Sequence, residues 1–455
     1  MRLTKLTMKN FRLFPDFSID FHPELTVIVA PNGGGKTTVL DAIRIAYGPF
    51  LSMFPTGRAK GVENDDVRQL RSESQYHKMS HSLPVIIQVD GELQVDNQIK
   101  WERKKATLKG KTSIKDARRL SEYASQLYAD TVINDNWPLL AYYGTGRLWN
   151  QLKLTERKVF NSGFNFREAG YLDCMEPASS YKFFVDWFRY VTRSDGDMKL
   201  QFIEKNPLAT AEQVAEFKGP FSVLLQVVRK AVNTVLKPTG WGNMVYSLSM
   251  GDVTVEHPEF GVLAVSQMSD GIRNSFALAA DIAWRCVQLN AHLEDRAALE
   301  TEGIVLIDEV DMHLHPEWQQ LVLGTLREAF PSIQFIVTTH SPQVLTTLRK
   351  ANIRILACDE ENNWIASEPD KSPLAHESGD ALAFIMGTHP RPEMSDILPD
   401  IHAFELLARS GKSNSEEAIQ IKQRLDAAGF EFNEADLSLF EFLARRAMQE
   451  KAGKA

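Results

Sequence analysis

The sequence has few cysteines, no long apolar segment and no excess of positive charge. Its 455 residues include only three cysteines, Cys174, Cys286 and Cys358, which are too widely separated to suggest a disulfide framework or a zinc site. No apolar run approaches the roughly 18 residues that cross a bilayer, and the first residues lack the unbroken apolar core of a signal peptide. We therefore expect a cytoplasmic protein with no membrane partner.

The charge balance argues against a protein that coats nucleic acid nonspecifically. There are 59 acidic and 51 basic residues, for a net charge of −8, whereas coating proteins of that kind are strongly basic. One local exception is the run from Arg103 to Arg119, which carries many positive side chains and few negative ones. Such a run can contact a DNA backbone, but an exposed hairpin end followed by a helix would have the same composition. Both interpretations stay open.

A glycine-rich stretch, APNGGGKTT at residues 30–38, is the strongest signal that is present. It follows an apolar run at residues 25–30, typical of a buried strand, and it opens a segment at residues 36–47 with helical apolar spacing. Consecutive glycines let backbone N–H groups turn around phosphate oxygens, and a helix that begins there points its positive dipole end at the anion. The predicted nucleotide contacts are Asn32, Gly33, Gly34, Gly35, Lys36, Thr37 and Thr38.

Within this loop, two side chains have separate expected roles. Lys36 reaches the β- and γ-phosphates, and the hydroxyl of Thr37 binds Mg²⁺. Ala30 replaces the glycine that usually opens the pattern, which costs little because that glycine mainly serves the exit from the strand.

Two later segments carry the remaining expected chemistry. An apolar strand leads into Asp308 and Glu309, so we expect Asp308 to hold Mg²⁺ and Glu309 to polarise the attacking water. A further strand at residues 335–339 ends in His340, whose imidazole is expected to face the γ-phosphate. His313 and His315 are two apart but no third metal ligand follows, which favours a packing or interface role.

The class of nucleotide protein is indicated by QMSDGIR at residues 267–273, which precedes an apolar helical run. A serine and a glycine at a helix start suit a phosphate. Here the sequence resembles the ABC-class ATPases, whose LSGGQ signature is matched by MSDGI. The resemblance implies a head-to-tail dimer in which Ser269, Asp270 and Gly271 of one protomer close over the ATP held by another. The Asn-Lys-x-Asp motif by which GTPases read guanine is missing.

Other segments narrow the family. The start, RLTKLTMKNFRLF, resembles SMC and RecF-like ATPases, and DMHLHPEWQ at residues 311–319 resembles the corresponding loop of OLD-like ATPases of bacterial defence systems. The resemblance makes Arg12 a candidate nucleotide neighbour. Residues 139–149 stand where these ATPases sense the γ-phosphate, but no clearly placed glutamine occurs there, so Tyr143 and Arg147 are the candidate contacts.

The C-terminal region indicates whether the ATPase contains its own nuclease domain or depends on a partner for that activity. An OLD nuclease needs a longer extension with a glutamate and an Asp-x-Asp pair for metals, and this tail has neither. It resembles instead the PtuA-type ATPase subunits of Septu anti-phage defence systems, and it does so in Gly379, Asp380, Ile385, Met386, Gly387, Arg391 and Pro392. This resemblance implies an HNH endonuclease subunit as partner, a homodimer or higher homo-oligomer, and DNA contact through the complex.

We expect an α/β fold, an ABC-type P-loop ATPase head with a mixed sheet flanked by helices. The predicted parts are an ATPase core lobe at 1–150, a helical insertion at 151–260, a second core lobe at 261–375, and a helical C-terminal region at 376–455 for partner or oligomer contacts. No heptad pattern persists, so the insertion is not a coiled-coil arm.

Two alternative functions remain open at this stage. A RecF- or SMC-like repair ATPase would clamp DNA itself, and a nucleotide sensor would bind ATP with little turnover. A transporter subunit is disfavoured, because it would carry a plain LSGGQ and a compact helical subdomain.

Overall fold

A computed structural model describes residues 1–71, 79–94, 96–129, 135–147, 167–177, 181–388 and 395–432, and single positions from there to residue 446. Contacts between residues divide the chain into two units, Met1–Met386 and Gly387–Ala455. Within the described ranges, none of the helices combines the length and apolar character that a bilayer span requires.

The strands of the first unit are as follows: β1 (Arg2–Phe11), β2 (Phe14–Asp20), β3 (Leu25–Val29), β4 (Gln69–Arg71), β5 (Met79–His81), β6 (Val85–Leu93), β7 (Asp96–Lys105), β8 (Leu139–Tyr143), β9 (Gly242–Ser247), β10 (Asp252–His257), β11 (Gly261–Ala264), β12 (Gly303–Ile307), β13 (Ile333–Thr338), β14 (Ile353–Cys358) and β15 (Trp364–Ser367).

The α-helices are α1 (Lys36–Ala46), α2 (Gly48–Leu51), α3 (Arg118–Ala129), α4 (Tyr181–Lys205), α5 (Ala211–Glu216), α6 (Pro220–Leu236), α7 (Asp270–Leu289), α8 (Ala297–Glu300), α9 (Pro316–Gln319), α10 (Val322–Ala329), α11 (Pro342–Leu345) and α12 (Ser378–Ile385), with α13 (Leu398–Arg409) and α14 (Glu416–Ala427) in the second unit.

A six-stranded sheet forms the centre of the first unit, in the order β15-β14-β3-β13-β12-β8. All neighbours are parallel except β15, which is antiparallel to β14. Every residue of β3, β8, β12 and β13 is buried, so these strands are buried along their whole length rather than on alternate residues. Because parallel strands end at the same edge, the segments that follow β3, β8, β12 and β13 lie together.

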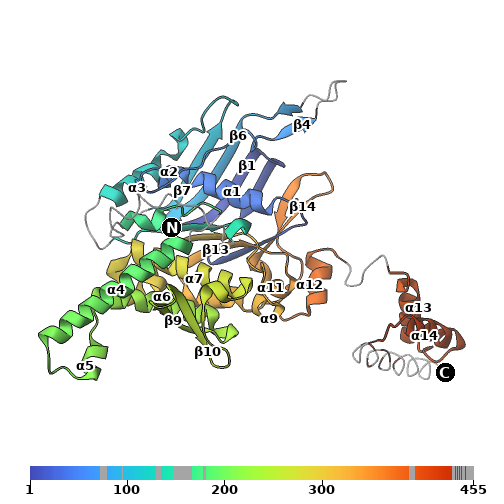
Figure 1. Ribbon diagram of the computed structural model, residues 1–455. Helices are drawn as coiled ribbons and strands as arrows, with labels where there is room; N and C mark the ends of the chain where they lie inside the picture. Colours follow the sequence, from blue (N-terminus) through green and yellow to red (C-terminus); the bar gives the residue numbers. More distant parts are fainter. Residues whose placement is uncertain are drawn as a thin grey trace. The chain divides into compact units, whose positions relative to one another are not determined.

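A second, antiparallel sheet has the order β2-β1-β6-β7. Its strand β6 alternates between buried and partly exposed residues, the pattern of a sheet with one face on the core. Helix α1 contacts β6 and β7 of this sheet and β13 of the central sheet, so it lies between the two. Figure 1 shows β1, β6, β7 and α1 in blue tones, with α2 and α3 beside them.

Helices α4, α6 and α7 and the small sheet β11-β10-β9 form a further part of the first unit. Helix α6 packs on α4, α7 and α10. Figure 1 shows α4 extending away from the sheets and carrying α5 at its far end. The prediction of an α/β fold with a mixed sheet flanked by helices is therefore confirmed.

The second unit has its own small core. Its buried members are Ile401, Phe404, Ala408, Ala418, Ile421, Leu425 and Phe440. On its surface Arg424 joins the two helices through bonds of 2.8 and 2.6 Å to the carboxylate of Asp400. The tail positions Arg391 and Pro392 lie outside the described residues.

Candidate nucleotide site

The loop between β3 and α1 has the backbone shape that its glycines allow. Gly33 and Gly35 have φ values of 77° and 87°, in the left-handed region that side chains disfavour. A Cβ on Gly34 would lie 2.7 Å from the Cβ of Ala30 and 2.9 Å from the carbonyl oxygen of Pro31. The turn therefore needs all three glycines, and Ala30 fits at the strand exit.

Lys36, the first residue of α1, folds back over this loop. Its Nζ donates hydrogen bonds to the carbonyl oxygens of Ala30 (2.9 Å) and Pro31 (3.3 Å). Burial lowers the pKa of Lys36, although nearby carboxylates, Asp308 foremost, act to raise it. The ammonium group thus lies beside the helix N-terminus, where a polyphosphate would be held.

The other predicted loop residues divide between the surface and the core. Asn32, Gly33 and Thr37 are exposed, whereas Thr38 is buried in the first turn of α1. Thr37 is therefore the hydroxyl of this turn that a ligand can reach.

Asp308 follows β12 and connects the loop to the neighbouring strands. Its Oδ2 accepts a hydrogen bond from Thr37 Oγ1 (2.7 Å), and its Oδ1 accepts one from Thr338 Oγ1 (2.6 Å). Asp308 is only 2% exposed. A hydroxyl and a carboxylate oxygen 2.7 Å apart beside a phosphate loop are the hard oxygen donors that Mg²⁺ prefers, so these residues fit that ion.

Glu309 turns away from the strand immediately after Asp308. Its φ is 50°, a left-handed value that is uncommon for glutamate. The turn aims its backbone N–H at Thr338 Oγ1 (2.8 Å), and the next residue, Val310, donates to the carbonyl of Thr338 (3.0 Å). Thr338 thus contacts both acidic residues of the predicted pair.

His340 lies just beyond β13, at the same edge of the sheet. Its neighbours are fixed: Thr339 bonds to Asp311 through its hydroxyl, and the Ser341 hydroxyl donates to Gln319 Oε1 (2.6 Å) and caps α11. The imidazole of His340 is partly exposed between them.

The two histidines of the following loop, His313 and His315, are exposed. Throughout the part of the chain that the structure describes, no three His, Cys, Asp or Glu side chains are grouped as a metal site would require.

The signature segment begins α7. Ser269 takes the extended N-cap conformation, and in the described structure its side chain makes no capping bond to α7. Asp270 is exposed and pairs with Arg273. A Cβ on Gly271 would collide with the carbonyl oxygen of His313, so this glycine lets α7 approach the loop that follows β12.

The candidate contacts outside these motifs have other partners in the chain. Arg12 bonds to Asp66 (2.9 Å) and to Asp41 of α1 (2.8 Å). Burial opposes its charge, but the two carboxylates together raise the pKa of Arg12. The side chain of Arg147 lies outside the described residues.

The side chain of Tyr143 reaches α7. Its hydroxyl donates to Asp281 Oδ2 (2.7 Å), which also accepts a bond from Arg285 (2.8 Å), and its backbone carbonyl accepts the N–H of Asp308 (2.8 Å). It therefore joins the signature helix to the residue after β12. Sequence reasoning missed this connection and the role of Thr338; the spacing of Asp281 and Arg285 within an apolar helical run was the available signal.

Comparison with known proteins agrees with this geometry. A family model described as "AAA domain" matches residues 5–206, and one described as "AAA domain, putative AbiEii toxin, Type IV TA system" matches residues 209–346. The "Retron Vc95 probable ATPase" of Vibrio cholerae serotype O1 biovar El Tor is 25% identical, over 93% of this chain and 86% of that protein.

Two further relatives share parts of the chain. The "Retron Ec83 probable ATPase" of Escherichia coli is 27% identical, over 78% of this chain and 71% of that protein. The "Septu protein PtuA" of Bacillus mycoides (strain KBAB4) is 42% identical, over 36% of this chain and 22% of that protein. Together with the phosphate loop, the paired acidic residues and the signature helix, these matches make the chain an ABC-like P-loop ATPase, a relative of the retron ATPases and of PtuA.

Proposed function

We propose that the chain binds ATP with Mg²⁺ in a head-to-tail dimer, hydrolyses it, and through this cycle controls a partner HNH endonuclease in anti-phage defence. The observation that carries the proposal is the set of bonds that joins Thr37, Asp308 and Thr338. These bonds bring the phosphate loop, β12 and β13 to one point.

The phosphates would be held by the loop N–H groups, by the N-terminal end of α1 and by Lys36, which would leave its carbonyl partners for the β- and γ-oxygens. Thr37 and Asp308 would hold Mg²⁺, which when bound neutralises phosphate charge. Glu309 lies next to Asp308 on the turn and would accept a proton from the attacking water. His340, at the end of the adjacent strand, would contact the γ-phosphate.

The second half of each site would come from the partner protomer. Ser269 and the free N–H groups at the start of α7 form an anion-binding helix end. Closure would add contacts that exist only in the dimer, so ATP would shift the population toward the closed state. Hydrolysis would remove those contacts and allow reopening.

The defence role is supported by the names of the relatives, which are retron and Septu proteins. The HNH partner is our inference from the resemblance of the tail to PtuA-type subunits. The second unit and the α4–α5 arm are the proposed docking elements for the nuclease or for further protomers, and DNA contact would occur through the complex.

The direct test is to purify the chain with and without the adjacent open reading frame, and to measure mass and DNA cleavage with and without ATP. Co-purification of an HNH protein, with cleavage that responds to ATP and loses that response in Lys36→Ala, would support the proposal. A chain that stays alone and closes on DNA only with ATP would replace it with a DNA clamp. ATP binding without measurable turnover would indicate a sensor.

A further inference from the structure

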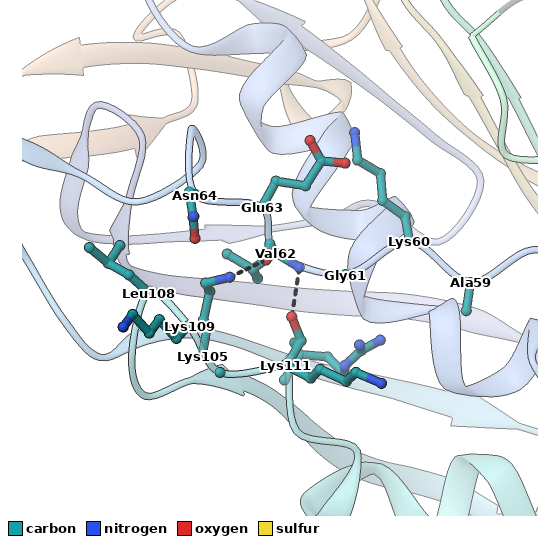
Figure 2. A pocket seen from close by; sticks show the side chains of 13 residues that line it. Ala59, Lys60, Gly61, Val62, Glu63, Asn64, Lys105, Leu108, Lys109 and Lys111 are labelled. Atoms are coloured by element: carbon teal, nitrogen blue, oxygen red, sulfur yellow. Dashed lines mark hydrogen bonds between the residues drawn. The ribbon is translucent and has the colours of Figure 1, made fainter.

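A positively charged hollow lies on the first unit, away from the nucleotide site. It has a volume of about 540 Å³ and is formed by the segment at residues 59–64 and by the end of β7 with the loop after it. Figure 2 shows Lys60 and Glu63 on one side, Lys109 and Lys111 on the other, and Lys105 between them. The hollow thus contains much of the basic run that the sequence singled out.

Two of the positive charges come from β7, whose alternate residues face the core. Ile99 and Trp101 face the core, and the same period of two places Arg103 and Lys105 on that face near the strand end. These two residues are only 4% and 6% exposed. Buried cations normally require a paired anion, because desolvation is costly.

Here the hydrogen-bond acceptors are backbone carbonyls, which carry no net charge. Arg103 donates to the carbonyl oxygens of Ile45 (2.8 Å) and Ser113 (3.1 Å), and Lys105 donates to that of Val62 (3.1 Å). Burial, with no neighbouring carboxylate to offset it, lowers the pKa of Arg103 to about 10. The positive charges at the base of the hollow therefore remain uncompensated.

The rim adds charge of the same sign. Lys60, Lys109 and Lys111 line the hollow against a single acidic side chain, Glu63. Among the described residues, none of the lining lysines, nor Arg103, lies within 4 Å of a carboxylate oxygen. Like charges this close repel one another, and an anion in the hollow would relieve that repulsion.

The walls are held in place without any ligand. Val62 donates its N–H to Thr112 Oγ1 (2.8 Å) and accepts from Lys105 through its carbonyl, as the dashed lines in Figure 2 mark. Ser113 donates to the carbonyl of Lys104 (2.7 Å) and closes the loop after β7. Fixed walls reduce the ordering cost of binding.

We propose that this hollow is a second phosphate-binding site, which takes a phosphate group carried by a free polyphosphate or by a nucleic-acid strand. It is separate from the phosphate loop. Arg103 contacts the last turn of α1 whereas Lys36 opens that helix, and nine residues of helix separate the two ends by roughly 14 Å.

The test measures binding to the full chain in a Lys36→Ala background, which removes the loop lysine. Two probes are titrated separately: inorganic pyrophosphate by calorimetry, and a fluorescent 20-nucleotide single-stranded DNA by anisotropy. The variant is Lys109→Gln/Lys111→Gln, in which both residues are exposed. Its control is Lys350→Gln/Lys371→Gln, which makes the same charge change at exposed positions that do not line the hollow.

We expect the Lys109→Gln/Lys111→Gln variant to bind at least one probe about tenfold more weakly and the control to bind within twofold of the parent. Loss for pyrophosphate identifies a free polyphosphate as a sufficient ligand, and loss for DNA alone identifies a strand. Equal weakening by both variants, or no binding of either probe, overturns the proposal. Unfolding temperatures within two degrees of the parent confirm that both variants are folded.

Discussion

At the scale of single residues, Thr338 organises the proposed catalytic acids. Its hydroxyl donates to Asp308 and accepts from the N–H of Glu309, at a position that is fully buried. One side chain thereby fixes the carboxylate expected to hold Mg²⁺ and the backbone of the expected base. Thr338 would thus act as a positioning residue, without contacting the nucleotide.

We predict that Thr338→Val, which keeps the shape but removes the hydroxyl, lowers ATP turnover roughly 10- to 100-fold, since displacement of catalytic groups has effects of that size. It should also weaken the apparent Mg²⁺ affinity, because Asp308 loses the hydrogen bond that its Oδ1 accepts from Thr338. A Mg²⁺ titration of the steady-state rate measures both. Thr338→Ser keeps the hydroxyl and should restore most of the activity; equal loss in both variants would contradict this role.

The three cysteines should differ sharply in reactivity. Burial raises the pKa of Cys174 and of Cys286 from 9.0 to about 12, whereas Cys358 is exposed. At pH 8 we expect one thiol per chain to react quickly with a disulfide reagent, none in Cys358→Ser, and three after unfolding. Fast reaction of two or more thiols in the folded protein would be inconsistent with this burial.

The same shifts predict a pH dependence of stability. Below pH 9 the buried thiols are neutral in both the folded and the unfolded chain. Between pH 9 and 12 the unfolded chain ionises while the folded chain does not, so the free energy of unfolding should fall as pH rises. Denaturant melts of the parent and of Cys174→Ala across this range measure the contribution.

The roles of these residues could be predicted from the sequence only where the residues that define the role are adjacent in the chain. The phosphate loop was predictable, because an apolar run, three glycines and a helical period are adjacent in the chain. The ion pairs of Arg12 were not predictable, since its partners Asp41 and Asp66 lie far along the chain. Thr338 has no feature that separates it from Thr339 until β12 and β13 are paired.

At the scale of elements, Tyr143 connects β8 to the signature helix α7. The five residues of β8 are all buried, so no alternation in the sequence shows which face each one occupies. The structure places the Tyr143 hydroxyl on Asp281, whose other partner is Arg285. A buried carboxylate with two donors is thereby shared between the strand and the helix.

Tyr143→Phe should lower the free energy of unfolding by about 1–3 kcal/mol, because Asp281 loses a buried donor. Tyr47→Phe is the matched control. The Tyr47 hydroxyl is also buried but has no hydrogen-bond partner among the described residues, so its removal should leave stability unchanged or slightly higher. Chemical denaturation measures both; equal destabilisation would show that the hydroxyl of Tyr143 contributes no specific bond.

β7 shows a different limit of prediction from sequence. Its period of two continues from Ile99 and Trp101 into Arg103 and Lys105, but cations are so seldom buried that the pattern did not predict a core-facing position for them. Their carbonyl partners come from α1, from the segment at residues 59–64 and from Ser113, which only the folded chain brings together.

At the scale of the whole molecule, the proposed dimer makes hydrolysis and association one process. Glu309→Gln should reduce turnover at least roughly 100-fold, in the range typical of a lost general base. ATP should then hold the closed dimer, and light scattering should show the mass doubling. Lys36→Ala/Glu309→Gln should remain monomeric; an unchanged mass of Glu309→Gln with saturating ATP would argue against dimer closure.

The contact between α7 and the loop after β12 has a consequence for how two such sites would behave. In a head-to-tail dimer, Gly271 would lie at the nucleotide that the partner protomer binds. The carbonyl oxygen of His313, which Gly271 approaches closely, is in the loop that begins with Glu309 of the same protomer. Movement at one site would therefore alter the geometry of the other, and linkage makes that influence mutual. The two nucleotide sites of the dimer would therefore bind ATP cooperatively, with a Hill coefficient above one.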